Sequence, residues 1–148
     1  MSNVKVRLGA LTGVAALAAG LVVAGAIPAA AEDSFTFGSA VTFPSGNVYM
    51  SVRNNTEGAT AGTIQWWADP DAEAGTPGDT LVATDSLTDG YGIEAHLSTG
   101  RVASTEGHSA PYTVQDGGNL TEGNKYTMWV CVVKGTFSKC SGKVSVTA

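Results

Sequence analysis

The chain is poor in the residues that carry out chemistry or bind metals. Its 148 residues include two cysteines, two histidines, and eight lysines and arginines against thirteen aspartates and glutamates. No G-x-S-x-G elbow, H-E-x-x-H pair or phosphate-binding loop is present. We therefore expect no enzyme activity, and we predict no catalytic, cofactor-binding or metal-binding residues.

The first 31 residues have the pattern of a secretory signal. Lys5 and Arg7 precede an uncharged run at 8–27, and Ala29–Ala31 supplies the small residues that a signal peptidase needs. A membrane anchor is the alternative, because the run is close to the roughly 20 residues that span a bilayer. Its alanine and glycine content favours the signal, so we expect residues 1–31 to be removed and the protein to be secreted.

Residues 32–148 are expected to form one acidic domain. The signal takes 31 of the 148 residues and two of the eight basic ones, which leaves 117 residues with six basic and thirteen acidic side chains and a net charge near −7. This length is sufficient for a single domain with its own core. The negative charge disfavours binding to nucleic acid and, after signal cleavage, to a membrane surface.

The sequence after Asp33 is typical of an all-β protein. Short runs rich in valine, isoleucine, threonine and aromatic residues are separated by clusters of glycine, asparagine, aspartate and proline, of which Asp69–Asp79 is the longest. No segment of this part has a sustained helical period. Seven or eight strands at this spacing favour an immunoglobulin-like β-sandwich, with a β-barrel as the alternative.

Period-two alternation assigns the two faces of each expected strand. The predicted core-facing sets are Val48, Met50 and Val52 on one strand and Ile93, Ala95 and Leu97 on another. In the segment TIQWWAD, Ile64 and Trp66 share the apolar side, whereas Trp67 lies with Gln65 on the polar side. We therefore expect one tryptophan to be buried and its neighbour to face outward.

The two cysteines are predicted to form a disulfide within a hairpin. With Gly135 and Thr136 as a two-residue turn, Cys131 lies opposite Cys140 in a non-hydrogen-bonded pair, where Cα atoms are about 4.5 to 5.5 Å apart. This distance suits a disulfide, and an exported chain with an even number of cysteines is normally oxidised. A zinc site and a reactive cysteine pair are weaker alternatives, because neither the ligand spacing nor a C-x-x-C geometry is present.

The strand that follows the hairpin poses a register problem. Strict alternation places Val144 and Val146 on the opposite side of the sheet from Met128. A bulge at Gly142 is one solution, since an extra residue shifts the parity and brings the valines to the core. The other solution is that both sides of the strand Tyr126–Val133 are covered, one by the core and the other by something else.

One polar cluster superficially resembles a catalytic site. Glu94, His96 and Ser98 share one side of a strand and supply an acid, a base and a nucleophile. Positions two apart on a strand are separated by about 7 Å, which is too far for a direct relay. A solvated polar face is the favoured interpretation.

A second cluster resembles a calcium loop. Asp69, Asp71 and Glu73 alternate as calcium ligands do, but the glycine and glutamate positions of an EF-hand are not matched. A turn rich in acids is favoured over a weak surface calcium site.

Trp67 and Trp129 are the candidate partner-binding residues. Trp67 is expected on a polar face, and Trp129 lies beside Cys131 on the side of its strand opposite Met128. Exposed tryptophans are enriched at protein interfaces, and they also stack on sugars. The apolar side that includes Trp129, Cys131 and Val133 is expected to be covered either by a partner or by a loop of the same chain. We favour a partner, because the longest loop is acidic and poor in apolar residues.

A resemblance to known proteins adds to this interpretation. The runs GYGIEAHLSTGRVASTEGHSAPYT and YTMWVCVVKGTFSKC, with the export signal, look like those of small secreted proteins of streptomycetes. Some proteins of this type are similar to the small adaptor subunit of secreted streptomycete toxin particles, which links a lectin-like subunit to a long polymorphic toxin. The resemblance covers at most residues 89–148 and implies an extracellular protein partner, without assigning a role to any residue.

The sequence thus indicates a secreted protein that works by binding. The first hypothesis is a protein-interaction subunit or adaptor in an extracellular complex. A carbohydrate- or cell-wall-binding module is the alternative. An inhibitor of a secreted hydrolase is a third hypothesis, which is weakened because no cysteines brace the loop Asp69–Asp79.

Overall fold

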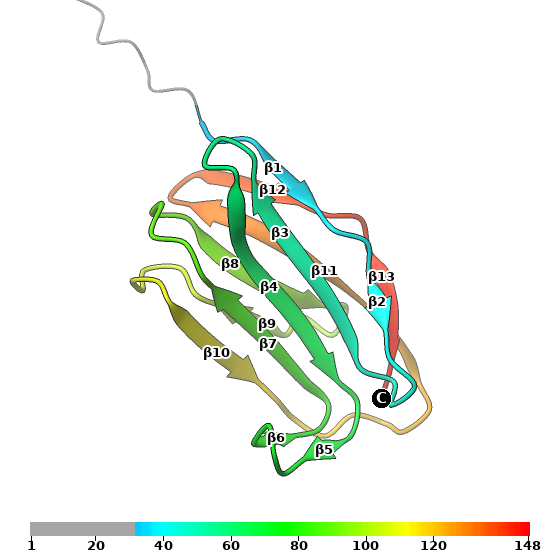
Figure 1. The fold of residues 1–148 in the computed structure, drawn as a ribbon. Coiled ribbons are helices and arrows are strands. Elements are labelled where there is room, and N and C mark those ends of the chain that lie inside the picture. The colour runs from blue at the N-terminus through cyan, green and yellow to red at the C-terminus, as the bar shows by residue number, and fades with distance from the viewer. Residues whose placement is uncertain (1–31) are drawn as a thin grey trace, which may run out of the picture. The chain divides into compact units, whose positions relative to one another are not determined.

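The computed structural model describes residues 32–148, which contain thirteen β-strands and no helix (Figure 1). This confirms the all-β prediction for this part of the chain. The expected number of seven or eight strands is too low, because five of the thirteen strands have only two or three residues. Within it, no helix is long and apolar enough to span a membrane. The predicted secretory signal, residues 1–31, lies outside the described residues and stays a prediction.

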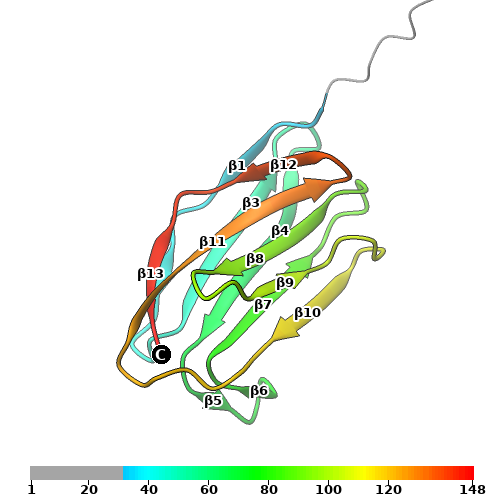
Figure 2. The ribbon, with the colours of Figure 1, turned by 180° about the vertical axis from the view of Figure 1, so that it is seen from behind.

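Two antiparallel sheets form the body of the domain and lie one behind the other (Figure 1 and Figure 2). The first sheet has the order β1-β3-β4-β7-β10, with β2 also paired with β3. Its strands are β1 (Phe35–Phe37), β2 (Val41–Thr42), β3 (Val48–Asn54), β4 (Ala59–Trp67), β7 (Thr80–Asp85) and β10 (Tyr112–Asp116). The second sheet has the order β12-β11-β8-β9, with β13 also paired with β11. Its strands are β8 (Gly92–Leu97), β9 (Val102–Ser104), β11 (Lys125–Lys134), β12 (Phe137–Cys140) and β13 (Val144–Thr147).

The long segment between β4 and β7 forms a small hairpin. In it, β5 (Pro70–Asp71) pairs with β6 (Thr76–Pro77). Asp71 Oδ1 accepts hydrogen bonds of 2.9 Å from the backbone amides of Glu73 and Ala74, so this carboxylate closes a turn. Within residues 32–148, no three histidine, cysteine, aspartate or glutamate side chains gather in a way that would hold a metal ion.

The core lies between the two sheets, as the alternation predicts. Both predicted core-facing sets are buried, with no member more than 3% exposed. The largest buried side chains come from both sheets and include Phe35, Ile64, Trp66, Leu81, Leu97 and Met128. Burial of apolar surface on this scale is the main force that holds the two sheets together.

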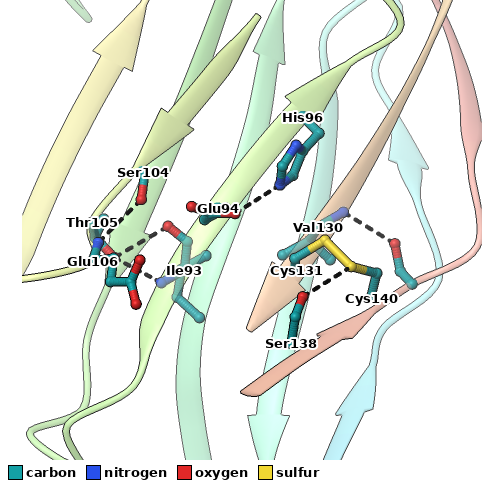
Figure 3. Close-up of polar contacts among 11 residues, drawn as sticks. Ile93, Glu94, His96, Ser104, Thr105, Glu106, Val130, Cys131, Ser138 and Cys140 are labelled. Atoms are coloured by element: carbon teal, nitrogen blue, oxygen red, sulfur yellow. Dashed lines mark hydrogen bonds and ion pairs between the residues drawn. A yellow bond between two sulfur atoms is a disulfide. The ribbon is translucent and has the colours of Figure 1, made fainter. Parts of the chain in front are cut away.

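The cysteine hairpin has the predicted register. Cys131 pairs with Cys140 and Lys134 with Phe137, and the S–S bond is 2.03 Å long (Figure 3). The Cα atoms of the two cysteines are 4.0 Å apart, slightly closer than expected. Gly135 has a φ of 58°, as the first position of a type II′ turn requires. The disulfide therefore joins β11 to its neighbour β12.

A bulge resolves the register of β13. Cys131 is opposite Cys140, but Met128 is opposite Val144, so two residues of β11 face the three residues 141–143. The extra residue is held by Ser141, whose amide donates to Val130 O at 2.9 Å and whose Oγ accepts from Val130 N at 3.1 Å (Figure 3). The predicted bulge is confirmed, and Val146 lies in the core, 2% exposed.

The immunoglobulin-like strand order is not confirmed. β3, β4 and β7 lie side by side in the first sheet, and only the small hairpin of β5 and β6 separates them in the chain. In the immunoglobulin sandwich of constant type, the corresponding sheet is ordered A-B-E-D, so its adjacent strands are not a simple meander. The described domain is therefore all-β and two-layered, with its own strand order.

Candidate binding face

Neighbouring indole rings at the end of β4 point to opposite sides of the first sheet. Trp66 is 0% exposed, and its Nε1 donates a hydrogen bond of 2.9 Å to Thr147 O at the end of the chain. Trp67 is half-buried and lies on the outer side. The prediction of one buried and one outward tryptophan is confirmed, and Trp67 is available at the surface.

A groove of about 430 Å³ lies beside Trp67. Its aromatic, proline and amide lining comes from Phe43, Pro44, Asn47, Tyr49, Gln65 and Trp67. The turn between β2 and β3 forms one wall, and Phe43 N donates to Asn47 O at 2.8 Å to close it. Phe43 is 48% exposed at the rim of the groove. The groove is thus a fixed surface feature built on the hairpin and β4.

Hydrogen bonds orient the polar groups of the groove. Trp67 Nε1 donates to Gln65 Oε1 at 2.9 Å, and Ala68 N donates to Asn47 Oδ1 at 3.0 Å. Both amide oxygens are therefore used, which leaves the amide nitrogens as donors. Within residues 32–148, neither Gln65 Nε2 nor Tyr49 Oη takes part in a hydrogen bond, so both are available to a ligand.

The groove belongs to a larger surface that is almost free of charge. We call this surface the neutral face; it consists of the outward side chains of the first sheet. Its two best-defined cross-strand rows are Tyr49-Gln65-Val82-Gln115 and Ser51-Thr63-Thr84-Thr113, each crossing β3, β4, β7 and β10. Among the outward residues of this sheet, Arg53 is the only charged one. Such a face is unusual for a domain with thirteen acidic residues.

The outer side of the second sheet is charged by contrast. His96 stacks on Trp129 with ring centroids 5.2 Å apart and an interplanar angle of 8°. Lys143 Nζ lies 4.4 Å from the centroid of the same indole and comes from the other side of β11. Both faces of Trp129 are therefore in contact with side chains of this chain, and no ring face is left for a ligand.

Glu94 and His96 are in direct contact, which the sequence analysis did not expect. His96 Nε2 and Glu94 Oε2 are 2.9 Å apart (Figure 3). The expectation failed because it used the spacing along the strand, whereas both side chains are long and lean toward each other. Ser98 takes no part, because its Oγ accepts a hydrogen bond from Thr127 N at 3.1 Å. The acid and base are paired, but no nucleophile joins them.

The apolar side of β11 around Cys131 is not uncovered as expected. Cys131 is 3% exposed and Val133 is 7% exposed in the free domain. Cys131 lies between its disulfide partner and Glu94, with which it is paired across the sheet. Glu106 packs against Gly92, opposite Val133, and accepts a hydrogen bond of 3.1 Å from Gly135 N. Side chains of the same chain therefore cover this set, and no partner is needed to bury it.

The two candidate tryptophans lie on opposite sheets. Trp67 is on β4 of the first sheet and Trp129 is on β11 of the second, and both point away from the core. They cannot contribute to one continuous binding surface. Sequence reasoning identified the outward positions of Tyr49 and Gln65 but not their place beside Trp67, because the pairing of β3 with β4 was not known.

One carboxyl group is buried at the opposite end of the first sheet from the groove. Asp85, at the end of β7, is 3% exposed, and its Oδ1 accepts a hydrogen bond of 3.1 Å from Leu87 N. Burial raises the pKa of Asp85, and the nearby charge of Asp89 raises it further. This group affects stability and is separate from the groove.

Comparison with known proteins gives no relative for this chain. No protein-family model, curated protein or solved structure matches it. The resemblance to small secreted streptomycete proteins therefore stays a prediction. The functional argument rests on the groove and the neutral face.

Proposed function

We propose that the protein is a secreted, non-enzymatic binding module and that its neutral face binds a neutral polysaccharide. The observation that carries this proposal is the groove beside Trp67, which combines aromatic rings with amide donors on the uncharged side of an acidic domain. Polysaccharide binding by this face requires only a rigid two-layered scaffold. It does not depend on whether the fold is classified as an immunoglobulin-like sandwich.

The chemistry of the groove fits a sugar chain. A sugar ring has an apolar face of C–H groups and a rim of hydroxyls, so it needs a flat aromatic surface next to donors and acceptors. Trp67 and Tyr49 supply the rings, and Gln65 Nε2 supplies a donor beside them. Apolar pockets with a few placed polar groups are the usual form of a small-ligand site.

The charge distribution favours a neutral ligand. An anionic polymer is repelled by the net charge near −7, derived from six basic and thirteen acidic residues after position 31. A cationic polymer would be attracted to acidic side chains, and the outward residues of the first sheet include none. A neutral polymer binds here without removing a charged group from water.

A protein partner is the second candidate. Val41 is 49% exposed and Phe43 is 48% exposed at the rim of the groove, and aromatic side chains without charges are typical of the centre of a protein interface. The outer side of the second sheet is a separate face, but its Trp129 is already in contact with His96 and Lys143. The hydroxyl- and amide-rich rows of the neutral face favour the polysaccharide.

The proposal is tested by adsorption of the secreted protein to polymers. We expect at least one neutral insoluble polysaccharide among cellulose, chitin and β-1,3-glucan to deplete the protein from solution. The anionic gels alginate and pectin should not deplete it. Adsorption to none of the neutral polymers would reject the proposal. Recovery of one protein in stoichiometric amount from culture supernatant, lost in Trp67→Ala, would support the adaptor in its place.

A further inference from the structure

A row of four hydroxyl side chains crosses the neutral face next to the groove. Ser51, Thr63, Thr84 and Thr113 are directly paired across β3, β4, β7 and β10. Thr84 Oγ1 and Thr113 Oγ1 are hydrogen-bonded at 3.0 Å. Three of the four side chains are β-branched and thus rigid, so their hydroxyls are held in a fixed line.

The row reaches well beyond the groove. Neighbouring strands are about 4.8 Å apart, so Ser51 and Thr113 are separated by about 14 Å across three strand spacings. The groove is lined by residues from 43 to 49 and from 65 to 67, which belong to β3, β4 and the turn before β3. A single sugar chain in the groove therefore lies over β3 and β4 and leaves the part on β7 and β10 without contact.

We propose that the row extends the binding site, so that the module binds the surface of an insoluble polysaccharide and contacts more than one of its chains. This inference rests on the proposed function. One chain occupies the groove against Trp67, and a neighbouring chain lies over the outward residues of β7 and β10. The occupant is a packed neutral polymer and not a soluble oligosaccharide.

Three observations support a wide, neutral occupant. The row continues without a charged residue to Thr113, and the parallel row ends in the amide of Gln115. In that parallel row, Val82 lies between Gln65 and Gln115 and is only 6% exposed, so it adds little apolar surface to the face. On the second sheet, outward positions of β8 carry Glu94 and His96, so the uncharged face is particular to the first sheet.

The test uses a double variant that removes two hydroxyls and keeps the shape. Thr84→Val with Thr113→Val preserves β-branching and volume on β7 and β10, the part of the row that a chain in the groove does not contact. Thr127→Val is the matched control, because Thr127 is half-buried like Thr84 and lies on an outward position of β11 in the second sheet. The binding affinity of each protein is measured for the insoluble polymer that adsorbs the wild type and for the soluble hexasaccharide of the same sugar.

We expect the double variant to bind the insoluble polymer about tenfold more weakly and the hexasaccharide with unchanged affinity, because each lost hydrogen bond has a modest net effect. The Thr127→Val control should match the wild type on both. Equal weakening on both ligands, or on neither, would overturn the inference while leaving the proposed function standing. A wild type that adsorbs to no polymer rejects the proposed function itself, and the inference with it.

Discussion

The indole nitrogen of Trp67 donates a hydrogen bond of 2.9 Å to Gln65 Oε1, two residues earlier on the same strand. This bond fixes the ring over the outer side of β4, and it leaves Gln65 Nε2 as a donor for a ligand. The indole ring of Trp67 and the donor Gln65 Nε2 are thus held in place before binding, which lowers the entropy lost when a ligand binds.

Replacing Gln65 by methionine should weaken ligand binding without unfolding the domain. The side chain keeps its length, but the acceptor for Trp67 Nε1 and the donor to the ligand are both lost. We expect the affinity for the soluble hexasaccharide to fall about threefold to tenfold, as measured by titration of tryptophan fluorescence. Gln115→Met is the control, since Gln115 shares the row but has no contact with the indole. Equal losses in the two variants would show that the Trp67 contact is irrelevant.

The secreted protein should contain no free thiol. Cys131 and Cys140 are bonded to each other and are the only cysteines of the chain. Replacing both by serine should leave a folded domain that is less stable by about 2.5 kcal/mol, because the bond closes a loop of nine residues. Urea unfolding measures the difference. Two reactive thiols in the denatured, unreduced wild type would show that the bond does not form.

Trp129→Ala should reduce stability and spare ligand binding. The indole is stacked between His96 and Lys143 on the outer side of β11. We expect a loss of about 2 kcal/mol in the free energy of unfolding, less than the roughly 3 to 5 kcal/mol for a core aromatic side chain, because Trp129 is half-buried. A stable variant that has lost a protein partner would instead support the adaptor function.

Asp85→Asn should stabilise the domain at neutral pH. The pKa of Asp85 is raised above the ordinary 3.8 by burial, so the folded state binds the proton more tightly than the unfolded state does. The stability that the protonated carboxyl contributes is therefore lost as pH rises from 3.8 through the raised value. Asparagine keeps the acceptor for Leu87 N and carries no charge.

We expect the melting temperature of Asp85→Asn to exceed that of the wild type by a few degrees at pH 7, since about 1 kcal/mol corresponds to about 4 °C for a domain of this size. The gap should close below pH 3.8, where the wild-type carboxyl is protonated in both states. The control is Asp69→Asn at an exposed position. The same gap at both pH values would show that the charge of Asp85 has no effect on stability.

Local pattern was sufficient to predict the all-β class, the cysteine hairpin and the core-facing sides of several strands. The turn chemistry of Gly135 and Thr136 specified the pairing of Cys131 with Cys140, since a two-residue loop leaves one register. Alternation alone separated Trp66 from Trp67. These predictions succeeded because a strand's period and its turn depend on a few neighbouring residues.

The pairing of strands that are distant in the chain could not be predicted from the sequence, and the binding face depends on this pairing. The row of hydroxyls exists only because β7 and β10 are added next to β4, and no single strand shows it. The covering of Val133 depends on Glu106, which is brought across by the connection after β9. The contact of Glu94 with His96 depends on how side chains lean, which backbone spacing does not specify.

The most direct test of the account compares two tryptophan variants on the polysaccharide that adsorbs the wild type. Trp67 and Trp129 are both half-buried and outward, on opposite sheets, so each is a control for the other. Adsorption isotherms should show at least about a tenfold loss of affinity for Trp67→Ala and wild-type affinity for folded Trp129→Ala. Wild-type affinity in Trp67→Ala would contradict the claim that the neutral face is the binding site.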